Sequence, residues 1–201
     1  MTRYAWIITV VGAVVIVSGT LAYRYQAASR PAQPAARPDL SHIGGGFTLQ
    51  GTDGAEVRLK DFRGQAVLLY FGYATCPDVC PTTLSLFKQT FARLGEAGDE
   101  VQVLFVTVDP ERDTPERMRS FVRYFHPDFR GLTGTPEQIR TVADRYKAAY
   151  MYSESESAAG YQVSHTDIVY LIDRQGRTAR LFSSKTAPDE LAAAVRDVLE
   201  G

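Results

Sequence analysis

The sequence predicts an α/β domain with a mixed central sheet flanked by helices. Two mostly apolar runs, residues 67–73 and 101–108, are typical of strands that are covered on both faces. An amphipathic segment at residues 82–94 separates them, and this strand–helix–strand order favours a parallel pair. Two later strand-like segments, residues 167–173 and 178–182, are joined by a short turn that contains Gly176, so they add antiparallel strands to the sheet.

The remaining elements follow in order along the chain. Short strands are predicted at residues 47–49 and 57–59, on either side of the Asp53-Gly54 turn. Thr114 and Pro115 are typical of a helix start, with threonine as the cap and proline in the first turn. Two further helices are predicted at residues 136–150 and 188–199. The apolar face of the helix at residues 82–94 carries Leu84, Phe87, Phe91 and Leu94.

The two cysteines of the chain narrow this fold prediction. Cys76 and Cys80 follow directly after the strand predicted at residues 67–73. Cysteines at the end of the first strand of a βαβ unit, with a hairpin and a helix later in the chain, are typical of the thioredoxin-like layout. We therefore expect residues 44–201 to form one thioredoxin-like domain.

The amino-terminal residues indicate a membrane anchor. Residues 4–23 include no charged residue, and at about 1.5 Å per residue they span about 30 Å, roughly the core of a bilayer. We expect residues 1–24 to be an uncleaved single-pass anchor rather than a signal peptide cleaved near residues 27–29. Residues 25–43, rich in proline and alanine, are expected to form a tether. No cysteine follows the apolar run, which excludes lipid attachment there.

The charges in the sequence argue against a nucleic-acid partner and do not decide the orientation of the expected membrane anchor. The formal net charge of −1 argues against nucleic-acid binding, which usually needs a basic face. Arg3 precedes the apolar run while Arg24, Arg30 and Arg37 follow it, so the positive-inside rule does not decide the orientation. No Arg- and Ser-rich presequence precedes the run, which favours a bacterial envelope over a mitochondrion.

The spacing of the two cysteines favours a soft-metal site. Three residues lie between Cys76 and Cys80, unlike the Cys-x-x-Cys of common redox pairs and zinc sites. Thiolates prefer soft ions, of which Cu(I) is the softest common one in biology. Pro81 fits the first position of a helix, which would make Cys80 the cap residue. Two alternatives remain: Cys76 and Cys80 could serve only in redox chemistry, or they could form a disulfide that only stabilises the structure.

His165 is the candidate third ligand. It lies just before a predicted strand and after the polar run at residues 153–157, which we expect to be mobile enough to bring it to the cysteines. Imidazole is a good copper ligand, and two thiolates need a third donor to hold an ion firmly. His42 and His126 are expected to be surface residues.

Two carboxylates are candidates for a supporting role near the thiols. Asp109 ends the second buried strand, and the carboxyl ends of parallel strands meet at one edge of a sheet. A plain strand-end turn is an equal alternative for it. Asp78, between the cysteines, is a hard oxygen donor and a poor Cu(I) ligand, but it is placed to orient the turn.

Three separated motifs carry a family resemblance. Residues 71–73 with Cys76-Pro77-Asp78-Val79-Cys80-Pro81, residues 108–115, and residues 161–165 with 170–173 together resemble the signature of the SCO/SenC family. The similarity extends from about Gly46 to the end of the chain. Many members have histidine just before the first cysteine, where this chain has Thr75. That position is not a ligand in the family.

The resemblance implies a membrane-tethered copper chaperone that helps to assemble the copper A centre of cytochrome c oxidase. It implies copper bound by Cys76, Cys80 and His165, with Asp109 nearby. The expected ion is Cu(I), with Cu(II) left open. The expected partners are subunit II of the oxidase, a periplasmic copper donor and a thiol reductant. The expected location is the bacterial inner membrane, with the domain exported.

The main alternative is an enzyme, a thiol–disulfide oxidoreductase that reduces the cysteines of the oxidase subunit or of another exported client. Both roles use the same thiols, and His165 discriminates them because disulfide exchange needs no third ligand. A thiol peroxidase is disfavoured: the only tryptophan is Trp6, and no proline stands immediately before Thr75 in the way that peroxiredoxins require.

Overall fold

The computed structural model of the chain describes residues 20, 24–25, 39–154 and 160–201. Asp39–Gly201 forms one compact unit. The anchor expected at residues 1–24 lies almost wholly outside the described residues, as does most of the tether expected at residues 25–43. In the part of the chain that is described, no helix combines the length and the apolar character needed to cross a bilayer.

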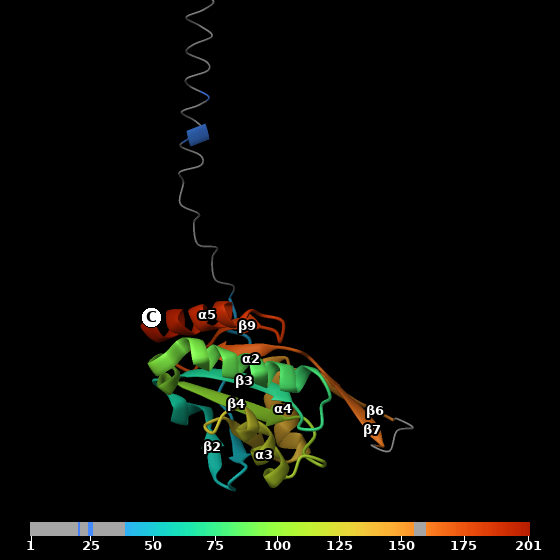
Figure 1. Ribbon diagram of the computed structural model, residues 1–201. Helices are drawn as coiled ribbons and strands as arrows, with labels where there is room; N and C mark the ends of the chain where they lie inside the picture. Colours follow the sequence, from blue (N-terminus) through green and yellow to red (C-terminus); the bar gives the residue numbers. More distant parts are fainter. Residues whose placement is uncertain (1–19, 21–23, 26–38, 155–159) are drawn as a thin grey trace, which may run out of the picture. The chain divides into compact units, whose positions relative to one another are not determined.

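A seven-stranded mixed sheet forms the centre of the domain (Figure 1), in the order β2-β1-β5-β4-β3-β8-β9. β3 pairs in parallel with β4, and β4 in parallel with β5, while β8 and β1 join this trio in antiparallel fashion. A separate two-stranded sheet is made by β6 and β7. The strands are β1 (Thr48–Gly51), β2 (Glu56–Arg58), β3 (Ala66–Gly72), β4 (Val101–Thr107), β5 (Arg130–Thr133), β6 (Tyr150–Glu154), β7 (Tyr161–His165), β8 (Val169–Ile172) and β9 (Thr178–Phe182).

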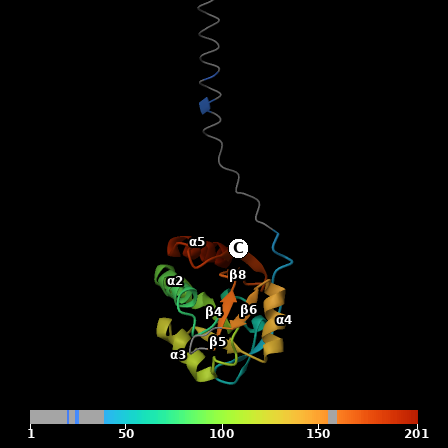
Figure 2. The same ribbon diagram turned by 90° about the vertical axis from the view of Figure 1, so that its right-hand side faces the viewer.

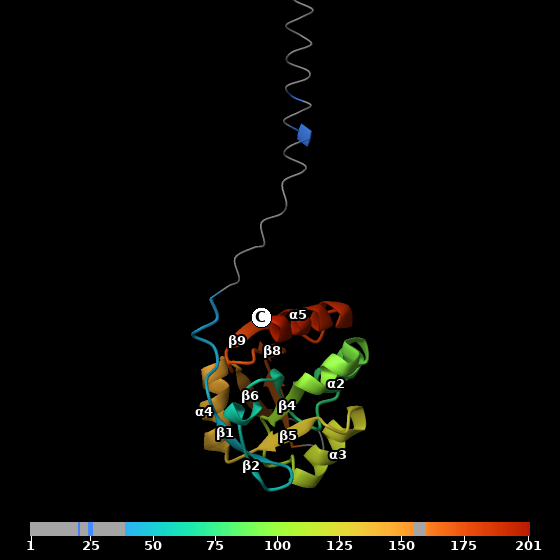
Figure 3. The ribbon, with the colours of Figure 1, turned by 90° about the vertical axis from the view of Figure 1, so that its left-hand side faces the viewer.

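Helices cover both faces of the large sheet (Figures 2 and 3). α2, α3 and α5 lie on one side and α4 lies on the other. Two neighbouring residues of β3 contact helices on opposite faces of the sheet. The ring of Tyr70 contacts Phe87 of α2, whereas the ring of Phe71 contacts Tyr146 of α4. Successive side chains of a strand point to opposite faces, so one buried strand serves both layers. The helices are η1 (Leu59–Phe62), α2 (Val79–Leu94), η2 (Gly95–Glu100), α3 (Pro115–Phe125), α4 (Pro136–Tyr146) and α5 (Pro188–Glu200).

The buried strands follow the sequence prediction closely. All seven residues of β3 are buried, and β4 is buried along nearly its whole length. Thr114 caps α3 by accepting a hydrogen bond from the backbone N–H of Arg117, with Pro115 in the first turn. The mixed sheet flanked by helices and the thioredoxin-like arrangement are therefore confirmed.

Two local predictions were wrong. Cys80 is not the cap of α2, because the helix begins at Val79 and Asp78 is the cap residue. α4 ends at Tyr146 instead of continuing to residue 150, because Lys147 adopts a left-handed conformation with φ of 56°. Of the polar run expected to be mobile, residues 153 and 154 form the end of β6. Residues 155–159 lie outside the described part.

Candidate metal centre

The turn between β3 and α2 brings the two thiols together. Cys76 lies in the turn, where its backbone N–H bonds to the carbonyl of Tyr73, and Cys80 lies in the first turn of α2. Both cysteines are buried free thiols. Gly72, the last residue of β3, makes room for Cys80: a Cβ atom built on it would lie 2.7 Å from the Sγ atom of Cys80. The close approach of this sulfur requires glycine at position 72.

The two thiols differ in acidity. A hydrogen bond from Cys80 lowers the pKa of Cys76 to about 3, and the backbone N–H groups of Asp78 and Cys80 act in the same direction. Burial raises the pKa of Cys80, and the neighbouring Cys76 adds to that shift. The pair therefore shares one proton, which stays on the fully buried Cys80, while Cys76 is the thiolate.

His165, the last residue of β7, completes the group. Its Nε2 atom lies 3.4 Å from the Sγ atom of Cys80. The ligand atoms of Cys76, Cys80 and His165 all lie within 4.8 Å of one another. On the other side of the ring, Nδ1 lies 3.1 Å from the carbonyl oxygen of Thr166. A carbonyl only accepts, so this hydrogen bond places a proton on Nδ1 and makes Nε2 the ring nitrogen that is directed to the sulfurs.

Two tyrosines, one within β3 and one directly after it, enclose the imidazole ring of His165. The rings of Tyr70 and Tyr73 meet the ring of His165 edge to face, at centroid distances of 5.9 and 5.7 Å. The hydroxyl of Tyr73 donates to the carbonyl of Val163, and that of Tyr70 donates to Asp167 at 3.3 Å. The sequence indicated only core residues here, but both tyrosines also fix the segment that carries His165.

Asp113 is a buried acid that the sequence analysis missed. Its Oδ2 atom accepts hydrogen bonds from the hydroxyl of Thr107 at 2.6 Å and from the backbone N–H of Ala74 at 2.9 Å. These bonds tie the residue just before the cysteine turn to the end of β4. Burial raises the pKa of Asp113, and its Oδ1 atom has no hydrogen-bond partner within the described residues. The Asp-Pro-Glu-Arg-Asp run was the available signal.

Neither of the two predicted carboxylates belongs to the three-residue group. Asp109 is fully buried two residues after the end of β4, where it accepts hydrogen bonds from Arg112 and from the hydroxyl of Tyr161. Asp78 is exposed, and its side chain makes no capping hydrogen bond. His42 is exposed, as expected, while His126 is partly buried and stacks on Phe129.

The donor set fits a soft, thiophilic cation. Two sulfurs and one imidazole nitrogen match the ligand preference of copper, while no carboxylate belongs to the group in the described residues. Burial shields the thiols, which suits a site that must hold a redox-sensitive ligand pair. The same pair, when metal-free, is close enough to be an intramolecular dithiol–disulfide couple.

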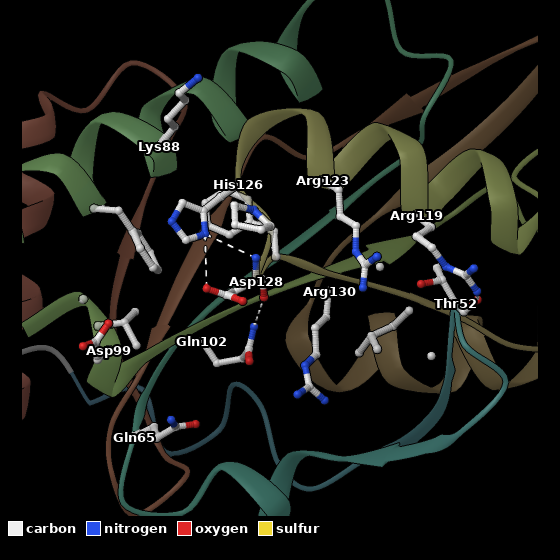
Figure 4. A pocket seen from close by; sticks show the side chains of 18 of the residues that line it. Thr52, Gln65, Lys88, Asp99, Gln102, Arg119, Arg123, His126, Asp128 and Arg130 are labelled. Carbon is white, nitrogen blue, oxygen red and sulfur yellow. Dashed lines mark hydrogen bonds and ion pairs between the residues drawn. The ribbon is translucent and has the colours of Figure 1, made fainter.

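A separate cavity of about 730 Å³ lies between α2, α3 and β5 (Figure 4), and its lining includes none of the three candidate ligands. The cavity is of ligand size. Its formal charges nearly cancel, because Lys88, Arg119, Arg123 and Arg130 share the lining with Asp53, Asp99 and Asp128. The cavity therefore does not favour an anionic ligand, and the metal group remains the better candidate site.

Comparisons with known proteins identify the family to which this chain is similar. The family model described as SCO1/SenC matches residues 35–200. An "SCO2-like protein" of Rickettsia felis is 34% identical over 154 residues, which is 76% of this chain and 75% of the relative. The structure of Bradyrhizobium japonicum ScoI with copper bound is 37% identical, with a TM-score of 0.71 over 78% of this chain and 99% of that one.

A more distant structure is also similar. BsSco, described as a member of the Sco family of cytochrome c oxidase assembly proteins with a disulfide switch, is 23% identical. The TM-score is 0.66 over 82% of this chain and 98% of that one, and at this identity the likeness shows the fold alone. The family model and the bacterial relative decide the assignment: the chain belongs to the SCO1/SenC family.

Proposed function

We propose that this chain is a copper-binding assembly factor that delivers copper to, or prepares, the copper A centre of cytochrome c oxidase. The observation that carries the proposal is the convergence of Cys76, Cys80 and His165, whose ligand atoms lie within 4.8 Å of one another. Membership of a family with copper-bound members supports it.

Copper is the cargo in this proposal, and the residues of the chain prepare a place for it. Cys76 is already a thiolate before the ion binds, so only Cys80 has to lose a proton on binding. His165 offers its Nε2 atom, because the hydrogen bond between Nδ1 and the carbonyl of Thr166 turns the other ring nitrogen toward the sulfurs. A site with two thiolates and one imidazole favours Cu(I).

Thiol–disulfide exchange is the second candidate, and the acidity of Cys76 favours it. A thiolate is the attacking species in disulfide exchange, and Cys76 is a thiolate at neutral pH with a second thiol beside it. BsSco is described as having a disulfide switch. In this role the chain would reduce the cysteines of the oxidase subunit or of another exported client.

The partners and the location complete the proposal. Subunit II of the oxidase is the proposed recipient, a periplasmic copper donor loads the site, and a thiol reductant keeps Cys76 and Cys80 free. The chain is proposed to be held at the bacterial inner membrane by one amino-terminal span, with the domain in the periplasm. The apolar run at residues 4–23 supports this location.

The test is complementation in a host whose own family member has been deleted. The parent chain is expected to restore the copper A signal of the oxidase, and the His165→Ala variant is expected to fail while its cysteines still cycle between thiol and disulfide. Full rescue by His165→Ala would instead favour the reductase role, because only metal delivery needs the imidazole. No rescue by the parent chain at high copper would count against both roles in oxidase assembly.

A further inference from the structure

We propose that Arg112 and Asp109 are positioning residues that hold His165 in place by gripping Tyr161 at the start of β7. The inference rests on the proposed ligand role of His165. It assigns a task to the Asp109-Pro110-Glu111-Arg112 motif, which contributes no atom to the three-ligand group.

Arg112 touches Tyr161 through both its backbone and its ring. The Nη1 atom of Arg112 donates to the carbonyl oxygen of Tyr161 at 2.9 Å, and its guanidinium carbon lies 3.9 Å from the centre of the Tyr161 ring. The Nε atom donates to Asp109 at 2.5 Å. A planar guanidinium is suited to donate along its edge while it stacks on an aromatic face.

Asp109 contacts Tyr161 at its hydroxyl group. It is fully buried and accepts a hydrogen bond of 2.6 Å from the hydroxyl of Tyr161. Tyr161 is therefore held at its backbone, at its ring and at its hydroxyl by two residues that follow β4. Hydrogen bonds to charged groups are the stronger ones in proteins, so this grip is firm for an element near the surface.

The hairpin that carries His165 needs such a hold. Among the strands that the structure describes, β6 and β7 pair only with each other, in a two-stranded sheet, and Figure 1 shows this hairpin reaching away from the body of the domain. A two-stranded hairpin alone is marginally stable in water. Tyr161, Val163 and His165 alternate along β7, so they share one face. The grip on Tyr161 and the bond from Tyr73 to the carbonyl of Val163 therefore orient the face that presents His165.

The competing explanation is a strand-end ion pair that only stabilises the domain. It would lower copper affinity and general stability together, whatever residue stands at position 165. Positioning acts only through the imidazole, so its effect on copper must vanish when the imidazole is absent. A double-mutant cycle with His165→Ala separates the two explanations.

Tyr161→Phe and Arg112→Lys are the variants of choice. Tyr161→Phe removes the hydroxyl bond to Asp109 and keeps the stacking on Arg112. Arg112→Lys keeps a positive charge beside the buried Asp109, so the fold is preserved, but it loses the forked contact with Tyr161. Arg177→Ala is the control, because Arg177 pairs with Asp173 on the turn that follows β8, at the end of that strand away from His165.

The experiment measures Cu(I) affinity by competition with a chelator, in the parent background and in the His165→Ala background. We expect each positioning variant to weaken Cu(I) binding by about 10- to 100-fold in the parent background, the range found for residues that orient metal ligands. In the His165→Ala background the same substitutions should change affinity less than about twofold. Equal losses in both backgrounds would overturn the inference.

Two readouts without metal complete the test. Amide hydrogen exchange of Val163 and His165 should be faster in the positioning variants of the metal-free protein, while the midpoint potential of the Cys76–Cys80 couple should match that of the parent. Unchanged exchange would contradict the grip. If His165→Ala itself leaves copper affinity unchanged, the proposed ligand set fails; if it weakens binding but the positioning variants do not, only this inference fails.

Discussion

The Nε2 atom of His165 lies 3.4 Å from the Sγ atom of Cys80, although 85 positions separate the two residues in the chain. The directions of the strands explain why these two atoms lie close together. β8 runs antiparallel to β3, with Val169 opposite Tyr70, so the segment that enters β8 lies at the edge of the sheet where β3 ends. The cysteine turn leaves β3 at that same edge. One sheet edge thus collects both thiols and the imidazole.

Loss of the imidazole should separate metal binding from disulfide chemistry. His165→Ala is expected to weaken Cu(I) binding at least as much as loss of an orienting residue, by about 100-fold or more, because it removes a ligand atom. Chelator competition measures this. The Cys76–Cys80 disulfide should still form and be reduced, since the histidine supplies no electrons. A variant that binds copper normally but loses redox cycling would reverse the two assignments.

Glycine at position 72 should be indispensable for packing beside Cys80. A Cβ atom there would lie 2.7 Å from the sulfur of Cys80 and 2.9 Å from the ring of Phe105, so Gly72→Ala should destabilise the fold by about 1–3 kcal/mol. Denaturant unfolding measures the change. Gly46→Ala is the matched control, since nothing lies within 4 Å of a Cβ at that position. Equal stability of the two variants would show that the sulfur does not occupy this position.

The acidity of Cys76 should be visible in its reactivity. Its pKa of about 3 lies below the value of about 8.5 for a cysteine in an unfolded chain. The folded state therefore favours the thiolate: this stabilisation is complete above about pH 8.5 and is lost as the pH falls toward 3. The rate of alkylation of Cys76 in the reduced, metal-free protein should be nearly constant from about pH 5 to pH 8.

An ordinary thiol would react roughly tenfold faster for each pH unit over that range, because its thiolate fraction rises by that factor. Such a slope at Cys76 would contradict the assignment. Cys80, whose pKa is raised by burial, should remain unreactive throughout. Mass spectrometry of the alkylated protein distinguishes the two positions.

Copper and the disulfide should exclude each other. A Cys76–Cys80 disulfide has no thiolate to offer, so only the reduced protein should bind Cu(I) tightly. At free copper 100-fold above the dissociation constant, the reduced form gains about 2.7 kcal/mol, which raises the midpoint potential by about 60 mV. Thiol–disulfide titration with and without Cu(I) measures the shift. A midpoint that does not move would mean that copper binds elsewhere.

Strong local patterns made much of the fold predictable. The uninterrupted apolar runs of β3 and β4 left few alternatives, and Thr114 with Pro115 marked the start of α3. β5 was missed because its four residues, Arg-Gly-Leu-Thr, include no apolar run and form a strand only between β4 and β1. The start of α2 was misplaced because Pro81 was assigned to the first helical position, whereas two helical residues precede it.

The candidate ligands of the site were predictable from the sequence, but the residues that hold them in place were not. The cysteine spacing and a histidine before a strand indicated the three candidate ligands. The β6–β7 hairpin was hidden by the polar Ser153-Glu154 run, since tertiary contacts rather than alternating apolar residues hold it. Arg112 and Tyr161 could not be paired from the sequence, because 49 positions separate them and only the fold brings β7 beside the end of β4.

The most direct test of the account is the copper content and affinity of the reduced chain beside its Cys76→Ala and Cys80→Ala variants. The parent is expected to hold one Cu(I) per chain against a competing chelator, and each variant is expected to lose tight binding, because every ligand atom of the three-residue group is needed. Stoichiometric Cu(I) retained by either cysteine variant would contradict the three-ligand site and the proposed function built on it.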